Sequence, residues 1–355
     1  MTSIHPTSKG TPMNTKRYSL IAAAAVLALT MTACSGQDSQ GSESGDATKS
    51  VANIVPGPLG DQSFYDDAES GIAQLKADGY TTTTLQGDAN NPAQWKANLQ
   101  SVSTGQNSVV VIGSSTASDT IESVAPSFPD QHYIFYDGDI DAPNVASLTY
   151  KQNEGSFLAG VLAALATTNT ADFPLAEGSK KVGLVGGMDI PVINDFAVGF
   201  KAGVEAVDPS IEVLVSFVGS FSDSAKGYDQ ATAIFDQGAD VVYQVAGGAG
   251  VGVLQAAADA DKYAIGVDSN QNALQEGHIL ASMLKYVGES IVQAIEADAD
   301  GSLVYGDVTS YGLANDGIGL TFDDNGGIVP DSVITDIETY KQKVIDGTIT
   351  VPSGF

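Results

Sequence analysis

The chain has 355 residues, with 43 acidic side chains against 15 Lys and Arg and a formal net charge of −28. This acidity argues against a nucleic-acid partner, because phosphate binding needs clustered cations, and favours a neutral or cationic small solute. The hydrophobic share of 43% is normal for a globular protein. After the N-terminal segment, no apolar run is long enough to span a bilayer.

Residues 1–33 have the pattern of a secretory signal peptide. Lys16 and Arg17 form a positive region, and the apolar run LIAAAAVLALTM follows them. The run is too short to be a transmembrane helix of the mature protein. Met13 stands just before the basic pair, so a translation start at Met13 in place of Met1 is an open alternative.

Cys34 is the single cysteine of the chain and directly follows the small residue Ala33. This placement matches the site at which bacterial lipoproteins are cleaved and acylated, and it predicts a lipid anchor at Cys34. The alternative is a coincidental cysteine beside an ordinary cleavage site. Small and polar residues over 34–50 predict a flexible tether. The body is therefore expected on the extracytoplasmic face of a bacterial cell membrane.

From residue 51 on, short β-branched runs alternate with helical patterns, which predicts βαβ units. Asp61 is placed to cap the first helix, whose apolar residues recur at helical spacing until Gly79. In this half of the body, strands are expected at 51–55, 81–85, 108–113, 132–138 and 145–151.

The pattern then runs again, with strands expected at 181–187, 211–219, 239–248 and 263–268. We therefore predict an α/β fold of two doubly wound parallel-sheet lobes, joined by crossover strands, with a ligand cleft at the carboxyl ends of the strands. The first lobe is expected to comprise 51–151 and 284–312, and the second lobe 152–283 and 313–355.

Side chains for catalysis or metal binding are few. Histidine occurs at His5, before the signal peptide's apolar run, and at His132 and His278, each before an apolar strand where a polar strand-end role is the simpler explanation. Metalloprotease, C-x-x-C, serine-hydrolase and phosphate-loop motifs are missing from the sequence. We expect a binding protein without catalytic residues, metal or cofactor. A hydrolase that uses a pair of carboxyl groups stays an open alternative.

A glycine-rich turn, AGGAGVG at 246–252, follows a strand and opens a helix. Its last glycine comes one position too early for the dinucleotide-binding pattern. We interpret the small residues as allowing the backbone to approach a ligand, with a tight turn alone as the alternative.

Several segments carry a family resemblance: GDQSFYD from Gly60, YIFYDGDIDAPNVASLTYKQNEGSFLAGVLAAL from Tyr133, VGLVGGMDIPVINDFAVGFKAGVEAVDPSIEV from Val182, FVGSFSDSAKG from Phe217, GADVVYQVAGGAGVGVLQAA from Gly238, YAIGVDSNQ from Tyr263, ILASMLK from Ile279 and VIDGTITVP from Val344. They span nearly all of the mature body and closely resemble the basic membrane protein family. These are substrate-binding lipoproteins of ABC importers, whose characterised members are purine nucleoside receptors. The resemblance implies a fold like that of the type I periplasmic binding proteins.

The resemblance also implies that a base lies between two aromatic rings, one from each lobe. The matching residues of this chain are Phe64 and Phe221. Stacking on an aromatic ring contributes about 1–3 kcal/mol per base and tolerates different bases. For Phe64, packing in the core below its helix is the alternative.

Asp137 and Asp268 each end an apolar strand, where doubly wound sheets bind ligands. By resemblance, Asp137 accepts a hydrogen bond from the base edge and Asp268 accepts from ribose hydroxyls; capping of the following segment is the alternative for both. Lys285 is expected to donate to ribose oxygens and to pair with Asp268, or else to be a solvated strand end. Gly247 and Gly248 are expected to give close backbone contacts.

One segment departs from the family pattern. Family members commonly read D-x-G-G-x-D-D-K-S-F-N where this chain reads V-P-G-P-L-G-D-Q-S-F-Y over 55–65, so that the lysine is Gln62 and the asparagine is Tyr65. An asparagine offers both a donor and an acceptor to a base, whereas a tyrosine offers one hydroxyl. We place Tyr65 in the ligand set, and the preferred base stays open.

The sequence thus predicts a monomeric receptor that closes on a nucleoside, with a purine favoured, and docks on an ABC permease driven by a separate ATPase. Two alternatives stay open. One is a receptor of the same fold for another neutral solute, such as a sugar or a modified base, and the other is a nucleoside hydrolase.

Overall fold

The structure is a computed structural model in which residues 49–355 are described. The predicted signal peptide, the lipidation of Cys34 and most of the predicted tether lie outside these residues. Ser50, expected at the end of the tether, is the first residue of strand β1 (Ser50–Val55). The first strand therefore begins one residue earlier than predicted.

The first sheet contains β1 and five further strands, β2 (Thr81–Gln86), β3 (Val109–Gly113), β4 (His132–Tyr136), β5 (Val145–Tyr150) and β11 (Val308–Tyr311). All are parallel and lie in the order β11-β5-β4-β3-β1-β2. β1 and β3 lie inside the sheet and are buried along their whole length, which fits their Val- and Ile-rich sequences. β2 is an edge strand, and its threonines alternate between exposed and half-buried.

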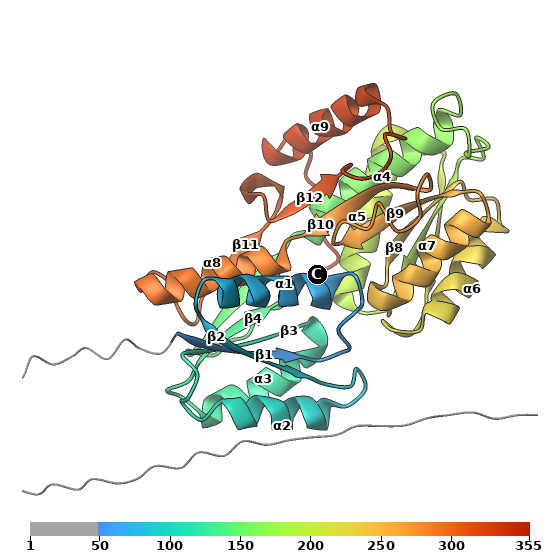
Figure 1. Ribbon diagram of the computed structural model, residues 1–355. Coiled ribbons are helices and arrows are strands. Elements are labelled where there is room, and N and C mark those ends of the chain that lie inside the picture. Colours follow the sequence, from blue (N-terminus) through green and yellow to red (C-terminus); the bar gives the residue numbers. More distant parts are fainter. Residues whose placement is uncertain (1–48) are drawn as a thin grey trace, which may run out of the picture. The chain divides into compact units, whose positions relative to one another are not determined.

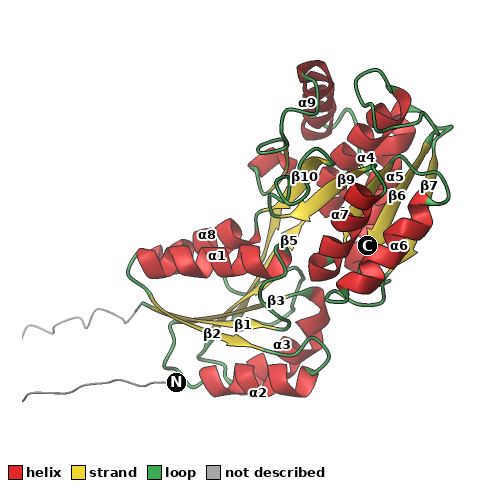
Figure 2. Ribbon diagram, turned by 45° about the vertical axis from the view of Figure 1, so that its right-hand side comes forward, coloured by secondary structure: helices red, strands yellow, loops and turns green. Residues whose placement is uncertain are grey.

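Helices cover both faces of this sheet, as Figures 1 and 2 show. α1 (Phe64–Ala77) and α8 (Val287–Asp300) pack together on one face. α2 (Pro92–Val102) and α3 (Ser118–Val124) cover the other. A Cβ atom on Gly71 of α1 would lie 2.3 Å from the carbonyl oxygen of Gly288, so glycine is what lets α1 and α8 approach this closely. We call this sheet with its four helices the first lobe.

The second sheet is built from β6 (Lys181–Gly186), β7 (Glu212–Phe217), β8 (Val241–Val245), β9 (Tyr263–Asp268), β10 (Ile279–Lys285) and β12 (Ile318–Thr321). Their order is β12-β10-β9-β8-β6-β7, and only β12 runs antiparallel to its neighbour. One face carries α4 (Gln152–Thr168) and α5 (Pro191–Val207), with α9 (Asp331–Ile345) against α4. The other carries α6 (Ser224–Phe235) and α7 (Gly250–Asp259). We call this assembly the second lobe.

Four short 3₁₀ helices complete the described part, η1 (Ser115–Ala117), η2 (Ala125–Ser127), η3 (Gly247–Ala249) and η4 (Leu313–Asn315). The predicted fold class, two doubly wound α/β lobes, is confirmed. β12 departs from the all-parallel prediction. After β10 the chain leaves for the first lobe, forms α8 and β11 there, and then returns, so that β12 enters the second sheet from the opposite end.

The chain passes between the two sheets at three places, which follow β5, β10 and β11. All three crossings leave the carboxyl ends of these strands, and Lys285 is the last residue of β10. Doubly wound sheets bind their ligands at the carboxyl ends of the strands. In this protein the chain connections between the two lobes lie at the same ends.

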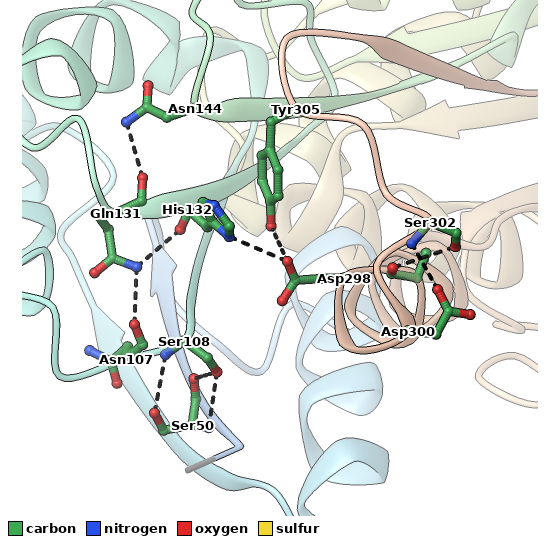
Figure 3. A network of polar contacts seen from close by, with 11 residues as sticks. Ser50, Asn107, Ser108, Gln131, His132, Asn144, Asp298, Asp300, Ser302 and Tyr305 are labelled. Carbon is green, nitrogen blue, oxygen red and sulfur yellow. Dashed lines mark hydrogen bonds and ion pairs between the residues drawn. The ribbon is translucent and has the colours of Figure 1, made fainter. Parts of the chain in front are cut away.

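A polar network at the other end of the first sheet ties α8 to β4 (Figure 3). His132 Nδ1 lies 3.3 Å from Asp298 Oδ1, and the Tyr305 hydroxyl donates to the same oxygen over 2.8 Å. The rings of His132 and Tyr305 stack with centroids 4.0 Å apart. At the start of β10, His278 Nδ1 lies 3.0 Å from the carbonyl oxygen of Lys262. Both histidines thus have the strand-end role that we predicted.

Within residues 49–355, every helix is too short or too polar to cross a membrane.

Candidate functional site

A cavity of about 260 Å³ lies between the two lobes, at the carboxyl ends of the strands of both sheets. We call it the main cavity. The eight residues that the sequence placed in the ligand set all line it: Phe64, Tyr65, Asp137, Phe221, Gly247, Gly248, Asp268 and Lys285. Their part in ligand binding stays a prediction, but the structure brings them together.

Phe64 reaches the main cavity from the start of α1. It is the first residue of the helix, and its ring lies 5.3 Å from the ring of Tyr65 and 5.6 Å from the ring of Tyr136, centroid to centroid. The Tyr65 ring in turn rests against Gly57, where a Cβ atom would come within 2.5 Å of Tyr65 Cε2. The first lobe therefore presents Phe64 as part of an aromatic cluster.

Asp61 fixes the turn that carries this cluster. Its buried carboxylate accepts hydrogen bonds from the backbone N–H groups of Ser63, Tyr65 and Asp66, over 3.0, 3.0 and 3.1 Å. Ser63 is the N-cap residue of α1, and its own side chain caps no N–H group, so Asp61 supplies the side-chain acceptor at this helix start, as predicted. Asp61 itself lines the main cavity, which the sequence analysis did not predict.

Phe221 reaches the cavity from the loop between β7 and α6. The ring rests on Gly187, where a Cβ atom would lie 2.3 Å from Phe221 Cδ1. The Phe221 carbonyl accepts from the backbone N–H of Ala249 over 3.0 Å, and Asp223 caps α6 by accepting from the N–H of Lys226. The second lobe therefore holds its aromatic ring on a glycine surface beside the glycine-rich turn.

The glycine-rich turn at 246–252 serves two purposes. Gly247, with φ of +54°, and Gly248 face the main cavity. Cβ atoms on Gly250 and Gly252 would lie 1.8 Å from Gln244 Oε1 and from the carbonyl oxygen of Ser224, respectively. Two glycines thus open the wall of the cavity, and two others allow α7 to pack closely on its neighbours.

Lys285 and Asp137 form a buried ion pair that joins the lobes. Their side chains are 2% and 8% exposed. The Lys285 ammonium also lies 5.2 Å from the ring centroid of Phe64 and 4.8 Å from that of Tyr150, within the range of cation–π attraction. Our prediction that Lys285 pairs with Asp268 is therefore wrong: the strand ends of β10 and β4 meet across the two sheets, and Asp137 is the carboxylate at that meeting point.

Asp268 is buried and has a different partner. Its Oδ2 accepts from the Ser63 hydroxyl of the first lobe over 2.6 Å. The pKa of Asp268 is raised to about 7, chiefly by burial and also by the charges of Asp61 and Asp137, while Lys285 and the Ser63 hydrogen bond act to lower it. The Asp268 carboxyl group therefore exchanges its proton near neutral pH.

Three of the strand ends around the cavity have left-handed backbone. Ser114 after β3, Asp137 after β4 and Asp268 at the end of β9 have φ values of +79°, +70° and +64°. A residue with a side chain pays strain in this region, although aspartate tolerates it better than most. Such conformations concentrate where side chains must point into a site.

Further hydrogen bonds join the lobes beside Asp268. Ser269 Oγ donates to the Ser63 carbonyl over 3.1 Å, and Gln271 Nε2 donates to the Gln62 carbonyl over 2.9 Å. The sequence analysis missed these contacts and the cavity residue Ser114. The only signal was that Gln62 and Ser63 stand next to Phe64 in a family segment.

Within residues 49–355, no group of three or more His, Cys, Asp or Glu side chains is arranged to hold a metal ion.

The chain matches the family model of the ABC transporter substrate-binding protein PnrA-like family over residues 48–354. It is 33% identical to the ABC transporter nucleoside-binding protein BmpA of Lactococcus lactis subsp. cremoris (strain MG1363), over 95% of this chain and 99% of that protein. It is 32% identical to the CD4+ T-cell-stimulating antigen of Listeria innocua, over 89% of this chain and 93% of the antigen.

Among solved structures, a solute-binding protein of an ABC transporter system from Aeropyrum pernix K1 superposes with a TM-score of 0.76 at 26% identity, over 85% of this chain and 93% of that one. A carbohydrate transporter solute-binding protein from Agrobacterium radiobacter superposes with a TM-score of 0.60 at 16% identity, over 82% and 99%, and shares the fold alone. The fold is that of type I periplasmic solute-binding proteins. Since the family model spans nearly the whole described body, this chain belongs to the PnrA-like family of ABC transporter substrate-binding proteins.

Proposed function

We propose that this protein is the receptor of an ABC importer and binds a nucleoside, with a purine favoured, in the main cavity. The observation that carries the proposal is that Phe64 and Phe221, one from each lobe, line the same cavity. Two aromatic faces suit a flat base, and each stacking contact contributes about 1–3 kcal/mol. The nucleoside-binding name of the Lactococcus lactis relative supports the same ligand class.

The charged residues of the cavity suit the sugar of a nucleoside. Asp268 can accept hydrogen bonds from hydroxyl groups, and Lys285 can donate to oxygens. Both side chains are buried. Because buried charges need partners, a ligand with several hydroxyl groups is favoured over an apolar one of the same size.

Size and charge limit the ligand further. The volume of about 260 Å³ lies just below the range of about 300–1,000 Å³ that is usual for small-molecule sites, so the cavity fits a compact solute. Asp61, Asp137 and Asp268 outnumber Lys285, the single cation in the wall of this cavity. A phosphorylated solute would meet this surplus of negative charge, so an uncharged nucleoside is favoured.

Tyr65 and Ser114 are the groups of the first lobe that we assign to the base edge, together with Asp137. Both line the cavity, and burial raises the pKa of the Tyr65 phenol, which stays protonated and can donate. In this chain a tyrosine hydroxyl replaces the amide that the family resemblance leads one to expect, so the preferred base can differ from that of relatives.

The remaining parts of the proposal concern the whole receptor. Cys34 is the lipid-bearing N-terminus, 34–50 is the tether, and the monomeric body works on the extracytoplasmic face with a permease and a separate ATPase. The expected lobe boundary at 284 needs a shift of two residues, because β10 of the second sheet ends at Lys285, so we divide the lobes as 51–151 with 286–312 and 152–285 with 313–355. Strand β11 in the first sheet and strand β12 in the second support this division.

Calorimetric titration of the protein with inosine, guanosine, adenosine, uridine and ribose tests the proposal. We expect saturable binding of at least one purine nucleoside, and weaker binding of uridine and of ribose. Binding of ribose alone would replace the proposal with a sugar receptor. Free base released during hours of incubation with a nucleoside would instead indicate a hydrolase.

A further inference from the structure

Gln271 is a buried side chain that connects the two lobes from outside the wall of the main cavity. It lies three residues after the end of β9 and is 1% exposed. Its Nε2 donates across the lobes to the Gln62 carbonyl over 2.9 Å. Its Oε1 accepts two hydrogen bonds within the second lobe, from Gln244 Nε2 over 2.6 Å and from the backbone N–H of Val267 over 3.0 Å. Both ends of this amide group therefore have partners.

Each partner of Gln271 belongs to a segment that carries residues of the main cavity. One segment is the turn before Phe64, and another is the end of β9, which carries Asp268. The third is the glycine-rich turn, because Gln244 Oε1 accepts from the Ala246 N–H over 3.1 Å. A single buried amide group therefore fixes three segments of the cavity wall relative to one another.

The second lobe holds Gln271 in this position. A Cβ atom on Gly266 would lie 2.8 Å from Gln271 Oε1, so glycine at this position makes room for the amide group. The Gln271 backbone N–H donates to Ser282 Oγ over 2.9 Å, and this hydroxyl donates to Asn272 Oδ1 over 2.7 Å. Ser282 and Asn272 are both buried. The Nε2 group of Gln271 is therefore oriented before it meets the first lobe, which lowers the entropic cost of the contact.

The acceptor in the first lobe is fixed as well. Gln62 has left-handed backbone, with φ of +54°, and its N–H donates to Asp66 Oδ2 over 2.8 Å. The Gly60 N–H donates to the other oxygen of the same carboxylate over 2.7 Å. The turn therefore holds the Gln62 carbonyl in one orientation. Because donor and acceptor belong to different lobes, the hydrogen bond exists only while the lobes lie against each other.

We propose that Gln271 is a positioning residue that couples the shape of the solute site to closure of the lobes. Through Gln244 and Val267 it sets the glycine-rich turn and the end of β9, and through Gln62 it stabilises the closed arrangement. A bound solute leaves only after this hydrogen bond breaks, so Gln271 slows dissociation without touching the solute. The inference rests on the proposed function for its probe, inosine, and not for the contacts between the lobes.

The variant Gln271→Glu tests the proposal through pH. A protonated glutamic acid has the shape of glutamine, with one acceptor oxygen and an O–H donor for the Gln62 carbonyl, whereas the ionised form has no donor. Stopped-flow mixing with inosine compares the variant with the native protein at the same pH. We expect equal dissociation rates at about pH 5 and an acceleration of about tenfold or more at about pH 8. The association rate should change by less than about twofold.

Gln131 supplies the matched control. It is also buried, and its Nε2 donates to the carbonyls of Asn107 and His132 over 3.2 and 3.1 Å, within the first lobe (Figure 3). Gln131→Glu also places a buried carboxyl group against backbone carbonyls, so it should lower the melting temperature at about pH 8. It should leave the dissociation rate unchanged. Equal acceleration in both variants, or none in Gln271→Glu, would overturn the positioning role.

Ser269→Ala covers the case in which a change at Gln271 prevents folding. The half-buried Ser269 hydroxyl donates to the Ser63 carbonyl over 3.1 Å, also between the lobes. Its removal should accelerate inosine dissociation about two- to tenfold. Ser103→Ala removes a hydroxyl that donates to the Leu99 carbonyl over 2.6 Å within the first lobe, and it should have no effect on dissociation. Unchanged dissociation in Ser269→Ala would contradict a role of these contacts in solute retention.

Small-angle X-ray scattering separates this inference from the proposed function. If the native protein gives no heat with inosine, the nucleoside proposal fails, and scattering by the protein without solute still tests Gln271. We expect a larger radius of gyration for Gln271→Glu than for Gln131→Glu at about pH 8, and equal values at about pH 5, because the ionised variant lacks a hydrogen bond of the closed arrangement. Equal radii at both pH values would overturn the contribution of Gln271 to closure.

Discussion

The two lobes present a phenylalanine to the same cavity in different ways. Phe64 begins a helix and packs against Tyr65 and Tyr136, whereas Phe221 lies in a loop and rests on Gly187. In each lobe an aspartate caps the helix beside the aromatic residue, but Asp61 is buried and accepts three backbone N–H groups, while Asp223 lies nearer the surface and accepts one.

This difference indicates that the two phenylalanines have different roles in ligand binding. A ring that is held by a helix and by other rings loses little conformational freedom when a ligand binds. A ring on a loop above a glycine can change its position to fit ligands of different shape. Fixing such a ring on binding costs conformational entropy, which lowers the affinity. We infer that the first lobe fixes the plane of the bound base and that the second lobe adapts to it.

The largest loss of stability is expected when the ion pair of Lys285 and Asp137 between the lobes is broken. Lys285→Met leaves Asp137 buried without its cation, which should lower the free energy of unfolding by about 3–5 kcal/mol. Chemical denaturation measures the loss. The exposed pair of Lys341 and Glu338 on α9 is the control, and Lys341→Met should cost less than about 1 kcal/mol. Restoration of stability in the double variant Lys285→Met with Asp137→Asn is expected, and its absence would argue against the pair as the cause.

The next largest effect, on nucleoside affinity and on stability, is expected to differ between Phe64 and Phe221. Phe221→Ala should weaken nucleoside binding more than tenfold and cost less stability than the same change at Phe64, because Phe221 is half-buried against the core but is stacked on no other aromatic ring within residues 49–355. Phe64→Ala should weaken binding to a similar degree and also cost about 1–3 kcal/mol of stability, because it removes contacts with two tyrosine rings. Titration calorimetry and denaturation on both variants decide. If the two variants were equally stable, the two lobes would not differ in how they hold their phenylalanine. Unchanged nucleoside affinity in Phe221→Ala would contradict stacking of the base on Phe221.

A pH dependence should follow from Asp268. Its pKa of about 7 in the folded protein is above the usual value of 3.8, so the folded protein holds this proton more tightly than the unfolded chain. The contribution of Asp268 to the stability of the ligand-free protein is therefore present at low pH and is lost as the pH rises from about 4 to 7.

Ligand binding should depend on pH in the opposite direction. If the ionised carboxylate accepts the sugar hydroxyls, nucleoside affinity should be about tenfold weaker at pH 6 than at pH 8. Titrations at both values, with Asp268→Asn as the control, measure this. A ratio that persists in the variant would assign the titration to another group, such as Asp67, whose pKa burial raises to about 6.

The smallest effect concerns the cap of the second lobe. Asp223→Ala removes the acceptor for the Lys226 N–H and should cost about 1 kcal/mol of stability, with a loss of nucleoside affinity of a few fold because the Phe221 loop is loosened. Asp223→Asn keeps an acceptor and should behave like the unaltered protein. Stability that falls without any change in affinity would show that the loop position of Phe221 does not depend on this cap.

The fold could be predicted in detail because its signals are local. The Val- and Ile-rich runs marked the buried strands, and Asp61 marked the start of α1 at the correct turn. The eight expected ligand residues share one cavity because each stands at the carboxyl end of a strand, in the loop after it, or at the start of the next helix.

The contacts between lobes could not be predicted, because they depend on how two separately folded sheets face each other. The pairing of Lys285 with Asp137, over 148 positions of sequence, has no local signal. The same holds for the hydrogen bond between Ser63 and Asp268, which are 205 positions apart. β11 and β12 were missed because each has only four residues, which is too short for a pattern.

Because of the hydrogen bond from Ser63 to Asp268, the Asp268 carboxylate both holds the lobes together and lines the main cavity. Its Oδ2 fastens the first lobe to the second, and in the described part of the chain Ser63 is the only side chain that donates to Asp268. Under the proposed function, Oδ1 is the atom left for a solute. A substitution at Asp268 would then alter both solute binding and the contact between the lobes. Changes in preference should instead accumulate at Tyr65 and Ser114, which leave that fastening untouched.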